Sequence, residues 1–127
     1  MKGGTALGRV LGHGSAKNGV GHWWMQRVTA VALLPLTIWF LASLLALHGF
    51  DHASVAAWIA GPWHAVLLCL LVMTLCSHSS LGVQVVIEDY VHGHGLKIAS
   101  LLLSNFAHVL VAAAGVFAVL KVAFVAN

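Results

Sequence analysis

Long apolar stretches alternate with short polar segments along this chain. Three runs contain no Asp, Glu, Lys or Arg: residues 28–47, 53–87 and 98–120. A membrane-spanning helix needs about 20 apolar residues, so the first and third runs each predict one crossing. The middle run is too long for one straight crossing, and its Gly61-Pro62 pair predicts a helix that begins near Pro62 after a short external segment. The pattern predicts three transmembrane helices, at approximately residues 24–47, 62–88 and 97–121.

The remaining segments predict a tail and two connections. Residues 1–21 are rich in glycine and form an expected surface tail, while residues 22–127 form the expected three-helix unit, with no internal repeat. No apolar core precedes Val28, so we expect no cleavable signal peptide. Residues 48–62 are the expected connection between the first two helices, and the segment His92-Gly93-His94-Gly95 predicts a tight turn into the third.

Composition places the chain among integral membrane proteins. Of its 127 residues, 61% are hydrophobic and only 7% are charged, which is too much apolar surface for a soluble domain to hide. We therefore expect an all-α membrane protein. Three helices are too few to enclose a cofactor or a channel, so we infer that the chain is one subunit of a larger assembly.

The distribution of basic residues predicts the orientation. Five lie in the tail, at the start of the first helix, or in the loop after the second helix: Lys2, Arg9, Lys17, Arg27 and Lys97. Only Lys121 falls on the other side. Because cytoplasmic segments carry the excess of lysine and arginine, the N-terminus is expected in the cytoplasm. The first 27 residues show neither a signal peptide nor the arginine- and serine-rich character of an organelle transit peptide, so a bacterial inner-membrane protein is expected. The net charge of +3 is thus a topology signal and does not indicate nucleic-acid binding.

His78 is a titratable residue in the middle of the second predicted helix. Such a side chain is expensive at membrane depth and normally faces a partner, a cofactor or water. It lies on a stripe spaced alternately by four and three residues, as on a helix face meant for another helix or a flat cofactor: Leu71, Leu75, His78, Gly82, Val85 and Asp89. Three interpretations stay open: a hydrogen bond to a neighbouring helix, ligation of haem iron, or a proton relay.

Asp89 and Tyr90 lie on or beside the same stripe. Eleven residues at about 100° bring Asp89 to within roughly 20° of His78, and a rise of about 1.5 Å per residue separates them by about 17 Å. The pair could cap and anchor a helix end. Alternatively, the phenol of Tyr90, the only tyrosine, could donate a hydrogen bond to a quinone oxygen, with Asp89 orienting it or passing protons.

Other polar residues offer weaker signals. Arg27 could pair with a haem propionate or extend to lipid headgroups, and His22 is a weaker candidate. His108, at a similar depth to His78, could complete a haem site within the chain or form a polar contact between helices. His48 with His52, and His92 with His94, are pairs without a third ligand, which is a weak metal signal.

The segment His78-x-x-x-Gly82-x-x-x-x-x-x-Asp89-Tyr90, preceded by Gln26-Arg27-Val28-Thr29-Ala30, resembles the small hydrophobic membrane-anchor subunit of succinate dehydrogenase, respiratory complex II. The resemblance runs from about Ser15 to the C-terminus. It implies three helices that pair with a second, cytochrome b-type anchor subunit in a helical bundle, beneath a flavoprotein and an iron–sulfur subunit on the cytoplasmic side.

The resemblance also assigns site residues. His78 falls on the family's axial ligand to haem b, whose other ligand comes from the second anchor subunit. Tyr90 and Asp89 fall on the pair at the ubiquinone site, and Arg27 falls near the haem propionates and the quinone pocket. His108 matches no residue that the family requires.

The predicted function is therefore that of a membrane anchor that helps to build the haem b and ubiquinone sites without oxidising succinate itself. One alternative is the anchor of a fumarate reductase. Another, of a different class, is a histidine-rich channel or metal transporter made of copies of this chain.

Overall fold

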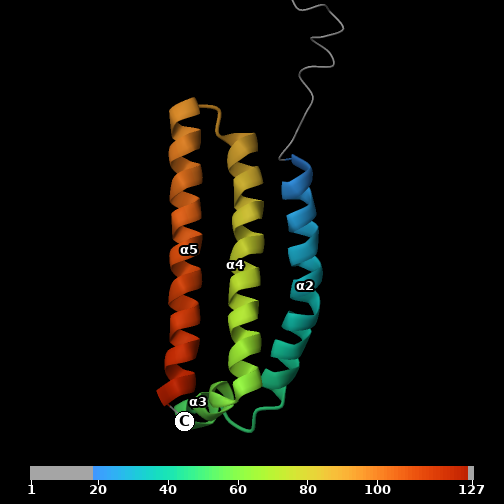
Figure 1. Ribbon diagram of the computed structural model, residues 1–127, viewed down its shortest axis with the longest axis vertical. Helices are drawn as coiled ribbons and strands as arrows, with labels where there is room; N and C mark the ends of the chain where they lie inside the picture. The colour runs from blue at the N-terminus through green and yellow to red at the C-terminus, as the bar shows by residue number, and fades with distance from the viewer. Residues whose placement is uncertain (1–18, 126–127) are drawn as a thin grey trace, which may run out of the picture.

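A computed structural model of the chain describes residues 19–125. They form four α-helices (Figure 1): α2 (Gly19–Leu45), α3 (His52–Ala60), α4 (Pro62–Tyr90) and α5 (His94–Val125). Three of them, α2, α4 and α5, are long and apolar enough to cross a membrane. This confirms the all-α class and the three long apolar helices of a multi-pass membrane protein. Most of the predicted tail, including Lys2, Arg9 and Lys17, lies outside the described residues.

The long helices lie in one row with α4 in the middle (Figure 1). α4 packs against both neighbours, whereas the described parts of α2 and α5 have no Cα atoms within 8 Å of each other. A single row of helices encloses almost no interior. The buried side chains among residues 19–125 are four apolar ones and one polar one: Ala60, Ala65, Leu68, Ala123 and Thr29. Both faces of the row are thus left for lipid or for other subunits.

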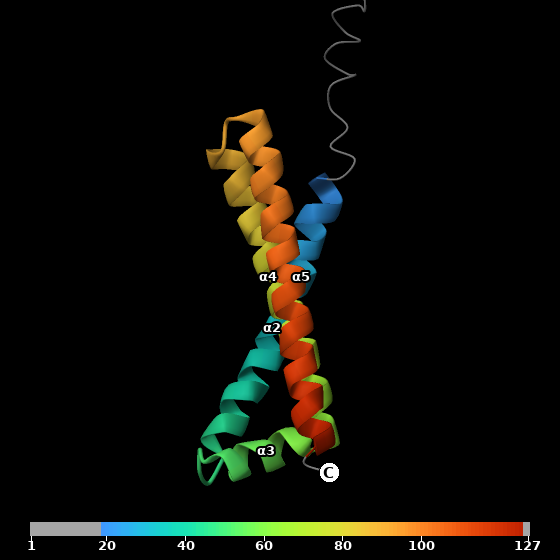
Figure 2. The same cartoon turned by 90° about the vertical axis from the view of Figure 1, so that its left-hand side faces the viewer.

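The two ends of the row differ. At one end α2 begins, α4 stops and α5 begins; we call this the Tyr90 end. The short helix α3 and the last turn of α5 occupy the opposite end, which we call the α3 end (Figure 1). α2 crosses α4 obliquely, so that the two helices diverge on either side of the crossing (Figure 2). On the side of the Tyr90 end, residues of both helices line a groove.

The helix bounds follow from local signals. α2 starts five residues before the predicted residue 24 and continues through Pro35. α4 begins at Pro62, directly after Gly61, and ends at Tyr90, where the Val91 N–H bonds to the Ile87 carbonyl over 3.0 Å. Its 29 residues span about 43 Å at about 1.5 Å per residue. Because the hydrocarbon core is only about 30 Å thick, the ends of α4 reach into the headgroup regions.

The segment predicted as a plain connection contains α3. Asp51 caps this helix: its Oδ2 accepts a hydrogen bond from the Ser54 N–H (3.1 Å), and its Oδ1 accepts one from the Ser54 hydroxyl (2.6 Å). These bonds satisfy a backbone donor that the first turn would otherwise leave unpaired. α3 packs against α4 and α5, so the connection forms a helical base under the row.

Candidate functional site

The ring of His78 is tied to the neighbouring helix by Thr29. Thr29 is the buried polar side chain noted above, with 7% of its surface exposed, and its Oγ1 lies 2.9 Å from His78 Nδ1. The same hydroxyl donates to the Met25 carbonyl on its own helix, over 2.8 Å, and approaches the Gln26 carbonyl at 3.1 Å. The contact therefore fixes the ring of His78 at the crossing of α2 and α4.

The other ring nitrogen of His78 is open. His78 is half-buried, and its Nε2 has no hydrogen-bond partner among residues 19–125. Twelve residues separate it from Tyr90, or about 18 Å along the axis, which places it well inside the membrane. A neutral imidazole held at one nitrogen and open at the other is the usual form of a histidine metal ligand. The residues present fit an axial ligand to haem iron.

A groove opens beside His78 on the Tyr90 side. It has a volume of about 590 Å³ and lies between the first half of α2 and the last turns of α4. Its lining comes from both helices: Gly19, His22, Trp23, Gln26, Gly82, Gln84, Val85 and Glu88. The atoms His22 Nε2 and Gln26 Oε1 are buried with no hydrogen-bond partner. Because unpaired buried polar atoms are rare and costly, the groove is suited to a polar group from outside the described chain.

Gly82 is one of the groove residues. A Cβ atom added there would meet only Gln26 Nε2, at 3.8 Å, which is ordinary van der Waals contact. No packing among residues 19–125 therefore requires glycine at this position. Its lack of a side chain widens the groove one turn from His78.

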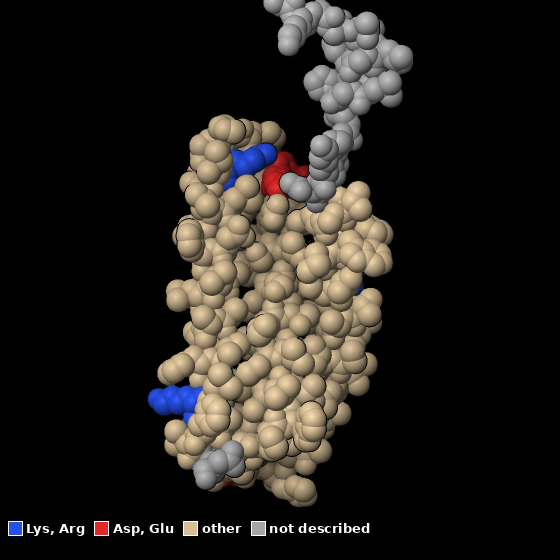
Figure 3. Space-filling view, viewed as in Figure 1, with Lys and Arg blue, Asp and Glu red and all other residues tan. Residues whose placement is uncertain are grey.

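Asp89 and Tyr90 are exposed in the last turn of α4, and Tyr90 keeps 78% of its surface. Neither side chain is hydrogen-bonded within residues 19–125. The neighbouring Glu88 is engaged instead: its carboxylate accepts from the Gln84 amide and its carbonyl accepts from Lys97 Nζ, both over 2.8 Å. Most of the charged surface on the face shown in Figure 3 lies toward the two ends of the molecule. The carboxylate of Asp89 and the phenol of Tyr90 are thus free to contact a ligand or another subunit.

Arg27 lies on a different side of α2. Its guanidinium is 5.1 Å from the centroid of the Trp23 ring, in a cation–π contact, and its side chain is exposed. Two residues at about 100° each place it about 200° around the helix from Thr29, and it is absent from the groove lining. The structure therefore turns Arg27 away from Thr29, and its contact with the groove is through Trp23, one of the lining residues.

His108 lies on α5 and contacts α4 on a different side from the one that carries His78. Its Nε2 is 3.1 Å from the Ser79 hydroxyl, and its Nδ1 is 2.8 Å from the Ser104 carbonyl. Nearby, the Ser80 hydroxyl donates to Asn105 Oδ1 over 3.2 Å. The contacts of His108 with Ser79 and of Ser80 with Asn105 join α4 to α5, whereas the contact with the Ser104 carbonyl lies within α5. Both ring nitrogens of His108 are engaged. The structure brings His108 together with Ser79 and does not pair it with His78.

The other histidines give no metal centre in the described part of the chain, which has no group of three or more His, Cys, Asp or Glu side chains placed to hold an ion. Near the His48 and His52 pair, Asp51 caps α3, and its hydrogen bonds from Ser54 lower the pKa of its carboxyl below the ordinary value. His92 and His94 are exposed at the turn.

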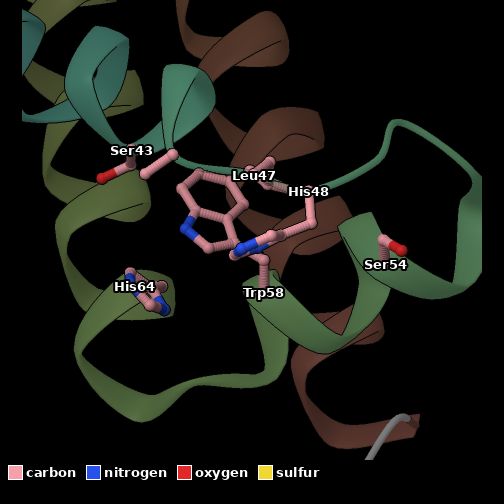
Figure 4. Close-up of a pocket in the computed structure, with 7 residues that line it drawn as sticks. Ser43, Leu47, His48, Ser54, Trp58 and His64 are labelled. Atoms are coloured by element: carbon pink, nitrogen blue, oxygen red, sulfur yellow. The ribbon is translucent and has the colours of Figure 1, made fainter.

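Sequence reasoning did not single out a cavity at the α3 end. Its volume is about 380 Å³, and its lining includes His48, Trp58 and His64 (Figure 4). Trp58 and His64 have ring centroids 5.2 Å apart, and Trp39 stacks on both at about 6 Å. Aromatic residues at a membrane boundary are a sequence signal for such a cluster. The cluster forms only where α2, α3 and α4 meet, and the sequence pattern does not show that meeting point.

Comparisons with known proteins point to one family. The family model described as the succinate dehydrogenase/fumarate reductase transmembrane subunit matches residues 1–120. The succinate dehydrogenase hydrophobic membrane anchor subunit of Rickettsia bellii is 38% identical, over 66% of this chain and 67% of its own length. The protein of the same name from Paracoccus denitrificans is 32% identical, over 81% and 80% of the two chains. The succinate dehydrogenase membrane anchor subunit of Reclinomonas americana is 30% identical, over 68% and 75%.

Proposed function

Because this chain belongs to the succinate dehydrogenase/fumarate reductase transmembrane-subunit family, we propose that it is the membrane anchor of a bacterial succinate dehydrogenase in the inner membrane. In this proposal the chain holds a flavoprotein and an iron–sulfur subunit at the membrane. It shares a haem b with a second, cytochrome b-type anchor subunit and forms part of a ubiquinone-reduction site. The oxidation of succinate belongs to the other subunits.

The open Nε2 of His78 is the observation that carries the haem proposal. The ring is fixed by Thr29, lies at membrane depth and has a groove on its Tyr90 side. A haem b bound there supplies a one-electron redox centre within the membrane. His78 would hold the haem through Nε2, and the gap at Gly82 would leave room beside it. The resemblance to the family implies that a second anchor subunit would supply the other iron ligand, and the uncovered face of the row of helices is compatible with such a partner.

The ubiquinone proposal rests on the free side chains at the Tyr90 end. The Tyr90 hydroxyl donates a hydrogen bond to a quinone carbonyl oxygen, where negative charge develops on reduction, and this bond favours electron transfer to the ring. Asp89, which has no partner of its own in the described chain, delivers a proton from the surface. The count of lysines and arginines puts this end in the cytoplasm, where the iron–sulfur and flavoprotein subunits would dock.

We assign Arg27 a role that differs from those of His78 and Tyr90. Its guanidinium is exposed and lies over the ring of Trp23, a residue of the groove lining. We therefore assign it to an anionic group between α2 and a neighbouring subunit, such as a haem propionate or the polar rim of the quinone pocket.

Purification of the tagged full chain from native membranes in mild detergent tests the proposal. We expect a flavoprotein and an iron–sulfur protein to co-purify, with a b-type haem signal in the reduced-minus-oxidised optical spectrum. The signal should disappear in His78→Ala and persist in the control His92→Ala, which alters an exposed turn histidine. A haem signal that survives in His78→Ala would contradict the ligand assignment, and purification without either soluble subunit would contradict the anchor function.

Membership of the family bears on the two alternative functions, a fumarate reductase anchor and a homo-oligomeric channel. Fumarate reductase anchors share the family description, and we favour the succinate dehydrogenase direction because the relatives named above are succinate dehydrogenase anchors. The ratio of succinate oxidation to fumarate reduction by the whole complex decides between them. Family membership argues against a homo-oligomeric channel.

A further inference from the structure

We infer that Thr29 is a positioning residue that sets the ring tautomer of His78. The Thr29 hydroxyl keeps the proton of the imidazole on Nδ1 and thereby leaves a free lone pair on Nε2. The contacts that carry this inference lie within the chain. Its consequence for haem rests on the function proposed above, in which His78 Nε2 is an axial ligand.

The Thr29 hydroxyl has a single proton to donate. Oγ1 lies 2.8 Å from the Met25 carbonyl oxygen and 3.1 Å from the Gln26 carbonyl oxygen. A carbonyl oxygen only accepts hydrogen bonds, so the hydroxyl donates its proton toward these two atoms. Donation to a carbonyl one turn back is the usual behaviour of threonine within a helix. The hydroxyl then has only lone pairs left to offer to His78.

The partner atom on His78 must therefore be the donor. Nδ1 lies 2.9 Å from Oγ1, a normal hydrogen-bond distance, and in neutral imidazole one nitrogen carries the proton while the other accepts. If Nδ1 donates, the proton is on Nδ1 and Nε2 is bare. In the opposite tautomer, either Nδ1 and Oγ1 would face each other without a proton, or the Thr29 hydroxyl would abandon the Met25 carbonyl.

Burial makes the preference strong. Thr29 is 7% exposed, so water has little access to compensate a mismatched contact, and an unpaired polar group costs more in a low-dielectric interior. The bond also connects two helices at the depth of His78. It therefore fixes both the tautomer and the orientation of the ring before any ligand arrives.

The bare nitrogen is the one that a metal needs. A histidine that ligates iron normally donates its other N–H to an acceptor, which orients the ring and increases the basicity of the ligating nitrogen. In this chain the acceptor is an uncharged hydroxyl supplied by α2. Loss of a partner of this kind typically costs about 10- to 100-fold in metal affinity or activity.

Three variants of the full chain test the inference. Thr29→Val keeps the shape of the side chain and removes the hydroxyl, while Thr29→Ser keeps the hydroxyl and removes a methyl group. The matched control is Thr37→Val, on the same helix at an exposed position. A merely structural role of Thr29 predicts effects on stability alone, so the readouts must report on the ring itself.

The first readout needs no haem. The ¹⁵N chemical shifts of the histidine rings are measured by solid-state NMR on the full-length chain in lipid bilayers, with His78 identified by difference from His78→Ala. We expect the Nδ1–H tautomer in the wild type, in Thr29→Ser and in Thr37→Val, and a mixture of tautomers in Thr29→Val. A wild-type ring protonated on Nε2, or an unchanged ring in Thr29→Val, would overturn the inference.

The second readout uses the intact complex. The rate of haem transfer to apomyoglobin and the EPR spectrum of the oxidised haem are measured for each variant. We expect transfer about 10-fold faster or more in Thr29→Val, with an altered EPR spectrum, and wild-type behaviour in Thr29→Ser and Thr37→Val. Unchanged transfer and EPR in Thr29→Val would refute the positioning role while leaving the haem proposal standing. If instead His78→Ala retains its haem, the ligand proposal fails and the NMR measurement still decides the role of Thr29.

Discussion

His108 Nε2 lies 3.1 Å from the hydroxyl of Ser79, the residue that follows His78 in α4. Consecutive residues of a helix point about 100° apart, so Ser79 faces α5 while His78 faces Thr29 on α2. His108 therefore approaches the segment of α4 that carries His78 from another side. A haem held between these two histidines would require His108 Nε2 to release the Ser79 hydroxyl and so to break a bond between α4 and α5, and for this reason we expect a helix-pairing role for His108.

The variant His108→Leu separates the two roles of this residue. We expect the haem signal to persist, because the ligand His78 and its Thr29 contact are untouched. The pairing of α4 with α5 should weaken by about 1 kcal/mol, since hydrogen bonds between membrane helices average about 0.6 kcal/mol and reach about 1.7 kcal/mol. An optical spectrum and a detergent-unfolding titration measure the two effects. Ser79→Ala serves as the control that removes the same bond from the α4 side, and loss of haem in His108→Leu alone would reinstate the site within the chain.

Tyr90→Phe tests the ubiquinone proposal. A lost hydrogen bond to a developing negative charge is worth about 1.5–3 kcal/mol, so we expect kcat/KM for ubiquinone to fall by about 10-fold or more. Stability should not change, because Tyr90 is 78% exposed and has no hydrogen bond within the described chain. Succinate oxidation with an artificial acceptor serves as the internal reference.

Trp63→Phe is the matched control for Tyr90→Phe. Trp63 has the same exposed fraction of 78% but lies near the start of α4, at the α3 end. Kinetics with ubiquinone should be normal in this variant. Equal losses of quinone reduction and of artificial-acceptor activity in Tyr90→Phe would indicate a role in assembly instead.

The long helices were predictable because their signals are local. Charge-free runs identify the crossings, and Gly61-Pro62 indicates where α4 begins. The capping pair Asp51 and Ser54 is also a local signal, and its spacing is sufficient to predict the start of α3. Helix ends depend on the last few hydrogen bonds and are less well determined by pattern.

The candidate site was only partly predictable. The position of His78 in an apolar run marks it as functional, but its partner Thr29 is 49 residues away in sequence and looks like many other threonines in apolar helices. Likewise, the position of Arg27 near the start of the first helix does not determine the side to which its side chain points. Pairing across helices depends on how α2 crosses α4, and no local pattern encodes that crossing.

The cap of α3 predicts a pH dependence at the α3 end. Hydrogen bonds from the Ser54 hydroxyl and, to a smaller extent, the Ser54 N–H hold the pKa of Asp51 below its ordinary value of 3.8. A lowered pKa in the folded state means that the stabilising effect is present above pH 3.8 and is lost as the pH falls through the folded-state pKa. We expect hydrogen exchange in the first turn of α3 to accelerate over that acidic range. Asp51→Asn should retain the cap without the pH dependence, because asparagine caps about as well as aspartate, whereas Asp51→Ala should exchange rapidly at every pH.

Gly115 lies where α5 packs so closely against α4 that we expect an added side-chain atom to be destabilising. A Cβ atom at this position of α5 would lie 2.9 Å from Val72 Cγ1 on α4, closer than real Cβ contacts, and valine has little freedom to move away. We expect Gly115→Ala to destabilise the α4–α5 pair by about 1–3 kcal/mol, measured by detergent-unfolding titration of the purified full chain. Gly95→Ala is the control on the same helix, where an added Cβ atom meets nothing within 4 Å. The double variant Val72→Ala with Gly115→Ala makes room for the new methyl group, so its destabilisation should be smaller than the sum of the two single effects. Additive effects would show that the close approach of Gly115 to Val72 does not limit the packing of these helices.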